Sequence, residues 1–447
     1  MLKSEAIASE QESKCIMVVQ QSDFNDSNQS LCDAIALEIA EHPKQKITFA
    51  EYMDLVLYHP QHGYYATKAA HIGPQGDFFT SPHLGADFGE LLAEQFVNMW
   101  EIMSKPSPFT LVEIGAGQGI LAADILQYLQ RQYPDFFKVL KYIIVEKSVT
   151  LRREQQQRLQ GLPISWLALE ELLNDEIIGC FFSNELVDAF PVHLFVIEKN
   201  KLQEIYVSRS LVGIDPLVLP PPSYALDMVA PDRAIPLNIT ESSEKIGFVE
   251  VTGEPSTAKL AEYFKLVGIQ LPSSAYPDGY RSEVNLAALD WLSMVSNKLK
   301  RGYLLTIDYG YPADKYYAPA RQQGTLQCYY RHRHHDNPYV NIGRQDITAH
   351  VDFTALERWG ELCGLEKIGF VKQEFFLMAL GLGSRMASLS SIDAKNPQAI
   401  HQVLQRREAL HQLMNPMGLG GFGVLVQSKG LTADQKACPL KGLSMPM

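Results

Sequence analysis

The stretch TLVEIGAGQG, residues 110–119, decides the fold of this chain. Thr110–Ile114 is typical of a short buried strand, and Gly119–Arg131 has the apolar spacing of a helix. Glycines between a strand and a helix let the backbone turn sharply and let a ligand lie against it. The stretch therefore predicts a ligand-binding loop at the carboxyl end of a strand.

Strands and helices alternate after this loop, which is typical of a parallel sheet covered on both faces. We therefore expect an α/β fold with a Rossmann-like sheet, mostly parallel with an antiparallel last strand. The further strands are expected at Tyr142–Val145, Ile164–Leu167, Gly179–Ser183, Tyr303–Ile307, Leu365–Val371 and Gly423–Gln427, and the helices at Val149–Leu159, Glu283–Leu299, Phe353–Cys363 and about Pro397–Leu413.

The alternation is interrupted by an insertion. A hairpin is expected at His193–Ser208, turning at Lys199–Asn200, and six prolines follow in Pro216–Pro236. The expected segments are a flexible N-terminal extension (1–30), an N-terminal helical segment with an active-site loop (31–108), the first half of the α/β domain (109–194), an inserted subdomain (195–282), the second half (283–430) and a C-terminal tail (431–447).

Composition excludes several classes of protein. The chain has 447 residues, a net charge of −12 and six scattered cysteines without a CxxC pair, so we expect no general nucleic-acid binding and no structural zinc. No apolar run reaches the roughly 18 residues that span a bilayer, so no membrane insertion is expected. The first thirty residues carry acids and no arginine, unlike a mitochondrial presequence. We expect a bacterial cytoplasmic protein, and its oligomeric state stays open.

The glycine loop differs from a dinucleotide-binding loop. In G-x-G-x-x-G the third glycine would stand at position 120, but Ile120 occupies it and the glycine comes one residue earlier. The form E-x-G-x-G-x-G, from Glu113 to Gly119, resembles the first motif of class I methyltransferases that use S-adenosylmethionine (SAM). Glu146, at the end of the next strand, can accept hydrogen bonds from ribose hydroxyls. A nicotinamide cofactor and a structural glycine turn remain the alternatives.

Two acids follow the fourth strand, in the stretch SNELVDAFP at residues 183–191. The carboxyl ends of parallel strands line the ligand crevice, so Glu185 and Asp188 are expected near the transferred methyl group. Paired carboxylates suit a guanidinium, which presents five donors in a planar fork. Glu185 could also take the departing proton. In the alternative interpretation, Asp188 caps the next helix.

Five stretches together resemble the MidA family, whose mitochondrial members are complex I assembly-factor methyltransferases. They are LVLYHPQHGYY at Leu55–Tyr65, GDFFTSP at Gly76–Pro82, VEIGAGQG at Val112–Gly119, SNELVDAFPVH at Ser183–His193, and RHRHHDNP through DITAHVDF at Arg331–Phe353.

The resemblance implies a SAM-dependent protein-arginine methyltransferase that acts on a subunit of respiratory complex I type. This chain lacks the mitochondrial presequence, so its acceptor can differ. The implied cofactor contacts are Glu113, Gly115, Ala116, Gly117 and Glu146; Asn184 and Glu185 would line the methyl site, and Thr80 and Ser81 would belong to a loop that closes over the pocket.

The segment Arg331–Asp336 (RHRHHD) has too irregular a histidine spacing for a zinc site, so no metal is expected. We expect a substrate-binding loop here, with Asp308, Tyr309 and His335 as contacts. A structural loop held by ion pairs is the alternative.

Two other functions stay open. One is an assembly chaperone that binds SAM and meets its partner through the insertion at 195–282. The other is a methyltransferase that acts on RNA or on a small molecule.

Overall fold

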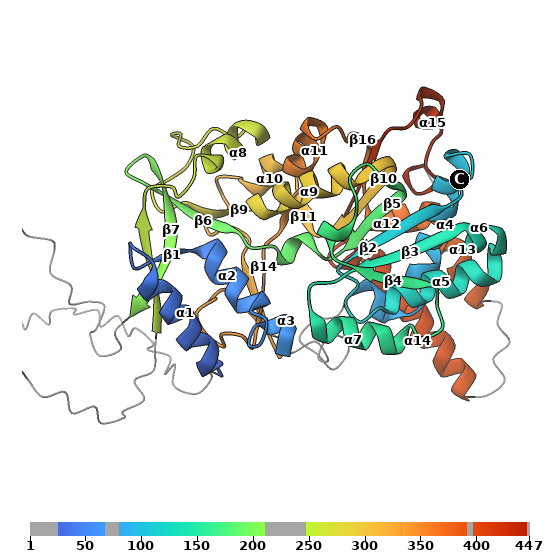
Figure 1. The fold of residues 1–447 in the computed structure, drawn as a ribbon, viewed down its shortest axis with the longest axis horizontal. Helices are drawn as coiled ribbons and strands as arrows, with labels where there is room; N and C mark the ends of the chain where they lie inside the picture. Colours follow the sequence, from blue (N-terminus) through green and yellow to red (C-terminus); the bar gives the residue numbers. More distant parts are fainter. Residues whose placement is uncertain (1–25, 68–79, 211–246, 332, 391–396, 445–447) are drawn as a thin grey trace, which may run out of the picture.

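The computed structural model describes residues 26–67, 80–210, 247–331, 333–390 and 397–444. A seven-stranded sheet forms its centre (Figure 1). Five neighbouring strands are parallel, and β17 runs antiparallel to both of its neighbours, so the predicted sheet is confirmed. In spatial order the strands are β16 (Glu366–Lys372), β17 (Gly423–Lys429), β10 (Leu299–Asp308), β5 (Ile177–Asn184), β2 (Phe109–Ile114), β3 (Leu140–Val145) and β4 (Ile164–Leu167).

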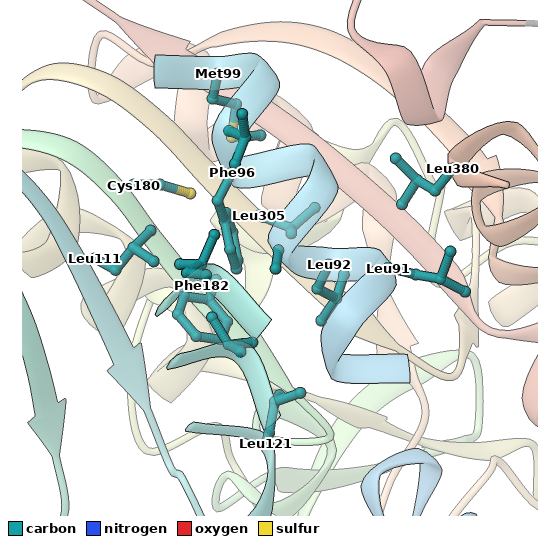
Figure 2. Packing of buried hydrophobic residues seen from close by; sticks show 14 of the residues in the cluster. Leu91, Leu92, Phe96, Met99, Leu111, Leu121, Cys180, Phe182, Leu305 and Leu380 are labelled. Atoms are coloured by element: carbon teal, nitrogen blue, oxygen red, sulfur yellow. The ribbon is translucent and has the colours of Figure 1, made fainter. Parts of the chain in front are cut away.

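Helices cover both faces of this sheet because successive strand residues point to opposite sides. Leu111 and Phe182 face one layer, whereas Val112 and Phe181 face the other. Figure 2 shows Phe96 of the covering helix α4 lying over Phe182. The first layer contains α4 (Asp87–Ile102), α5 (Ile120–Gln132), α6 (Pro134–Val139), α12 (Gln373–Leu380), α13 (Leu382–Ser390) and α14 (Pro397–Met414), and the second contains α9 (Leu286–Lys298) and α11 (Phe353–Leu362).

The order of the strands creates a switch point between β2 and β5. The chain moves outward from β2 to β3 and β4, and then returns to the other side of β2 with β5. In such sheets the ligand crevice lies at the carboxyl ends of the two strands that flank the reversal. Gly115 and Glu185 directly follow these two ends, so the topology brings the glycine loop and the post-strand acids together.

The insertion forms a second sheet. The hairpin predicted at His193–Ser208 is confirmed, and Lys199 and Asn200 at its turn have positive φ. Residues 211–246, which contain the proline-rich stretch, lie outside the described residues. The strands are β1 (Ile47–Thr48), β7 (Lys201–Ser210), β6 (His193–Glu198) and β9 (Arg281–Val284) in order, with β8 (Gly247–Gly253) paired to β7.

Segments expected to be separate share this second sheet. β1 comes from the N-terminal segment and pairs with β7 of the insertion. The helices α1 (Gln29–Glu41) and α2 (Phe49–Tyr58) pack against the same sheet, and α8 (Lys259–Val267) packs against other residues of β6. The N-terminal helices and the insertion therefore form one body beside the main sheet (Figure 1).

The segment between β10 and α11 is more regular than the loop expected from its sequence. It contains a three-stranded sheet, and a further strand pair joins its two ends. The elements are β11 (Gly310–Tyr311), α10 (Ala313–Tyr316), β12 (Gln327–Tyr330), β13 (Arg333–His335), β14 (Asp346–Thr348) and β15 (Val351–Asp352).

Short elements complete the described chain. Residues 1–25 of the expected extension lie outside the description, whereas the backbone amide of Asp26 already donates to Asn341. The segment after residue 430 packs on the core, and the Gly442 amide donates to buried Gln95. Within the described residues, no helix is long and apolar enough to cross a membrane. The short elements are α3 (Tyr64–Thr67), η2 (Ser81–Leu84), α7 (Val149–Arg158), η3 (Leu169–Glu171), η4 (Val187–Ala189), η5 (Leu419–Gly421), α15 (Ala433–Ala437) and η6 (Lys441–Leu443).

Candidate active site

The glycine loop turns through a left-handed backbone. Gly115 and Gly117 have φ of 73° and 51°, conformations that residues with a Cβ rarely adopt. A Cβ on Gly115 would also stand 2.7 Å from Cδ1 of Leu186. The loop can therefore bring its backbone close to the space beyond β2.

A first cavity lies beside this loop; we call it the loop cavity. The residues that line it come from the glycine loop, from the ends of β2, β3 and β5, and from the segment that begins at Thr80. Seven of the eight expected cofactor contacts lie in its wall, namely Thr80, Glu113, Gly115, Ala116, Gly117, Glu146 and Asn184.

Ser81, the eighth expected cofactor contact, does not line the loop cavity but bonds to Glu185, which does. It is fully buried, and its backbone amide donates to Oε1 of Glu185 at 3.4 Å. Its hydroxyl accepts from Gln373. The neighbouring His83 contacts Thr80 Oγ1 at 2.7 Å and Gln118 Oε1 at 3.4 Å. This segment therefore joins the glycine loop to the acid after β5.

Glu146 is held in place at the end of β3. One carboxylate oxygen accepts from the Ser148 amide at 2.9 Å, and the other accepts from Gln155 Nε2 at 3.0 Å. The same Gln155 nitrogen donates to the carbonyl of Gly117 at 2.8 Å. Burial raises the pKa of Glu146 despite these bonds. Gln155 thus links Glu146 to the glycine loop. Gln155 was not identified from the sequence, because α7 resembles an ordinary polar helix.

Glu113 is almost completely enclosed at the base of the loop. The hydroxyl of Tyr142 donates to its Oε2 at 2.6 Å. Burial raises the pKa of Glu113 to about 7, and this hydrogen bond limits the rise. Glu113 can therefore be uncharged or charged near neutral pH, depending on what occupies the cavity.

Glu185 adopts a strained backbone conformation at the end of β5. Its φ is 52°, which for a residue other than glycine costs on the order of 1–3 kcal/mol and is commonest at functional sites. Asn184 Nδ2 donates to Glu185 Oε1 at 3.0 Å, while the buried Oδ1 of Asn184 has no partner among the described residues. Asn184 therefore retains an unpaired acceptor beside the strained residue.

A second, larger cavity adjoins Glu185 as well; we call it the outer cavity. Tyr65 and Glu185 line both cavities. The Tyr65 hydroxyl donates to Asp346 at 3.0 Å, and its ring stacks on Tyr58 at 5.3 Å between centroids. Sequence reasoning missed both tyrosines, although they lie in the quoted stretch LVLYHPQHGYY. The two cavities therefore adjoin each other at Tyr65 and Glu185.

Asp188 faces the outer cavity. The hydroxyl of Tyr309 donates to its Oδ2 at 2.5 Å, and its buried Oδ1 has no partner among the described residues. It lies within the three-residue helix η4 and caps no longer helix, contrary to the alternative interpretation. Burial raises the pKa of Asp188 to about 6 and that of Glu185 to about 8, and the proximity of Asp188 contributes to the second shift.

The structure corrects the expectation that Asp308 binds substrate. Asp308 is fully buried, and its Oδ2 accepts from the backbone amides of Leu186, Val187 and Asp188. Its Oδ1 accepts from the amide of Tyr309 at 2.9 Å. Because both oxygens bind backbone amides, Asp308 fixes the turn that carries the acids. Tyr309 itself lines the outer cavity.

The Arg/His segment lies at the outer cavity as expected of a substrate-binding loop, but His335 is not among the residues that line it. His335 Nδ1 accepts from the amide of Asn337, and the buried Nε2 has no partner among the described residues. Arg333 and His334 line the outer cavity in its place. No group of three histidine, cysteine or carboxylate side chains in the described parts of the chain is placed to hold a metal ion.

A parallel sheet with a glycine loop and a cavity at its switch point is the arrangement of the class I SAM-dependent methyltransferases. The family model described as "Putative S-adenosyl-L-methionine-dependent methyltransferase" matches residues 91–371, more than half of the chain. The chain belongs to this family, and it is a SAM-dependent methyltransferase.

Known relatives extend this comparison over most of the chain. The protein arginine methyltransferase NDUFAF7 of rat mitochondria is 28% identical over 84% of this chain and 79% of its own length. The human protein of the same name is 28% identical over 84% and 78%. A crystal structure from Burkholderia thailandensis, bound to S-adenosyl-homocysteine, is 28% identical, covers 93% of this chain and 94% of its own, and has a TM-score of 0.73.

Proposed function

We propose that this methyltransferase transfers a methyl group from SAM to an arginine side chain of a partner protein. The observation that carries the proposal is the wall between the two cavities, where Glu185 and Tyr65 face both. The names of the rat and human relatives, which are protein arginine methyltransferases, support it. By family resemblance, the acceptor is a subunit of respiratory complex I type. A bacterial cytoplasmic location stays a prediction.

We assign the cofactor to the loop cavity. SAM, when bound, supplies a methyl group on a positively charged sulfur. Gly115 and Gly117 would receive its amino-acid and nucleoside parts along the backbone, and Glu146 would accept from the ribose hydroxyls. The unpaired Oδ1 of Asn184 is a ready acceptor for the cofactor's ammonium group. These residues therefore supply the close backbone surface and the acceptors that this cofactor requires.

We assign the acceptor arginine to the outer cavity. Glu185 is half-buried and Asp188 is buried, neither has a cationic partner among its described contacts, and Asp188 has an unpaired oxygen. A guanidinium offers several donors in one plane and relieves the repulsion between two carboxylates. It would therefore be drawn to the end of the outer cavity that adjoins the loop cavity.

Within this arrangement the protein aligns two reactants and moves one proton. Alignment matters because methyl transfer is an in-line displacement: the new N–C bond forms on the side opposite the breaking C–S bond. Ionised Glu185 would hold the attacking nitrogen and accept the proton that this nitrogen loses. Tyr65, fixed by Asp346 and Tyr58, would close the space around the methyl group against water.

The test is methyl transfer from isotopically labelled SAM into an extract of cells that lack this protein. The expected result is label that protease removes and nuclease does not, and that forms at least about tenfold more slowly with Glu185→Gln. Label sensitive to nuclease, or label of low mass, would replace the proposal with an RNA or small-molecule acceptor. SAM binding without any transfer, together with restored assembly of a partner complex by Glu185→Gln in a deletion strain, would replace it with the assembly chaperone.

A further inference from the structure

The side chains of the RHRHHD segment (Arg331–Asp336) fall into two groups. Some contact other residues of the chain, and others line the outer cavity. Arg331 pairs with Asp26 at 3.6 Å, and His335 accepts from Asn337. Arg333 and His334 are exposed on β13 and line the outer cavity. Among the described residues, Arg333 has no carboxylate partner, in contrast to Arg331. A free guanidinium at the wall of a substrate cavity is available to a ligand.

Charge is distributed unevenly across the outer cavity. Asp188 and Asp346 are buried acids in its lining, whereas the acids Glu185 and Glu374 are half-buried. Of the cations Arg333 and Lys372 in the lining, Arg333 is exposed and Lys372 is half-buried. They differ in availability, since Lys372 donates to the carbonyl of Gly421 at 2.7 Å and lies close to the acid Glu374. Arg333 is therefore the cation with most capacity for a new partner.

We propose that Arg333 recognises an acidic residue that lies close to the target arginine in the acceptor protein. This inference rests on the proposed function, because it assumes an arginine at Glu185 and Asp188. The arginine of such an acceptor segment would face Glu185 and Asp188. Its neighbouring acid would face Arg333, so each charge of the segment would meet its opposite. A lysine at the neighbouring position would instead meet Arg333 with like charge.

The experiment uses the full chain and a set of arginine-containing peptides, each with Asp, Asn or Lys placed at one neighbouring position in turn. With wild-type enzyme, the best Asp peptide should have a KM about two- to fivefold below its Asn counterpart, as for a partly exposed ion pair. The kcat should stay unchanged, because the contact is made equally in the ground and transition states. The preference should weaken at high salt.

Two variants test whether Arg333, and not a neighbouring residue, causes the preference for an acid. Arg333→Gln should abolish the preference for Asp, and Arg333→Glu should transfer it to Lys. Arg331→Gln, the matched control two residues away, should retain the wild-type preference. Equal KM values across the wild-type set, or a preference that survives Arg333→Gln, would overturn this inference alone. Failure of wild-type enzyme to methylate any of the peptides would overturn both the inference and the proposed function.

Discussion

The substitution Glu185→Gln isolates the charge of the carboxyl group between the two cavities. Oε1 of Glu185 accepts from Asn184 at 3.0 Å and from the Ser81 amide at 3.4 Å. The glutamine carbonyl oxygen can accept both bonds, so we expect an intact fold and unchanged SAM affinity. What the variant loses is a charge-assisted contact to the acceptor, worth about 1.5–3 kcal/mol. That range corresponds to a fall in kcat/KM of about ten- to a hundredfold.

The size of this effect should depend on pH. Burial and Asp188 raise the pKa of Glu185 to about 8, so at pH 7 only about one free molecule in ten carries the ionised carboxylate. Because the guanidinium stays charged, wild-type kcat/KM should rise with pH and level off above about 8. Glu185→Gln should lack this rise. The ratio of wild-type to variant activity should therefore grow between pH 6 and pH 9.

The assay is initial-rate methylation with labelled SAM across this pH range, with SAM affinity measured by calorimetry. Glu374→Gln is the matched control, because it removes a carboxyl group that lines the outer cavity without lining the loop cavity. It should keep the pH-dependent rise. Full turnover by Glu185→Gln, or a wild-type to variant ratio that is constant with pH, would refute the role of Glu185.

Three further substitutions test other parts of the site. Asp308→Ala leaves four amide donors, two buried and two partly buried, without their acceptor, so it should lower the free energy of unfolding by about 3–5 kcal/mol in chemical denaturation; an unchanged midpoint would contradict this. Gly115→Ala, at φ 73° and 2.7 Å from the Leu186 side chain, should weaken SAM binding at least about tenfold by calorimetry, and wild-type affinity would disprove the loop's role. Tyr309→Phe removes the 2.5 Å hydrogen bond to Asp188 and should lower kcat/KM about tenfold with SAM affinity unchanged; a parallel loss of SAM affinity would count against separate sites.

Much of the central sheet could be predicted from the sequence. Apolar runs such as Thr110–Ile114 lie in strands buried on both faces, where a continuous hydrophobic pattern is required. The spatial order of these strands, and with it the switch point between β2 and β5, was seen only in the structure. Boundaries were less accurate: the helix expected from Glu283 begins at Leu286, because Asn285 caps it and Arg281–Val284 pairs with β6. Tertiary pairing decided that boundary, and local periodicity could not reveal it.

The outer cavity was harder to predict because it is built from distant segments. Tyr65 belongs to the N-terminal helices, and its hydroxyl donates to Asp346, which lies far away in the sequence. Strands as short as Arg333–His335 carry too few residues to show a period. Adjacency to a strand end correctly suggested that Asp308 is close to the acids. It could not indicate that backbone amides, and not solvent, face its carboxylate.

The most direct test of the central claim is the identity of the methylated residue. The labelled acceptor protein should be isolated after reaction with the wild-type enzyme, hydrolysed completely in acid and separated against methylated amino-acid standards. We predict that the label elutes with methylated arginine and that Glu185→Gln lowers the initial rate at which this peak forms by about ten- to a hundredfold under matched conditions. Label that elutes with methylated lysine or histidine, or that is released as methanol from a carboxyl ester, would contradict the assignment of a guanidinium to Glu185 and Asp188.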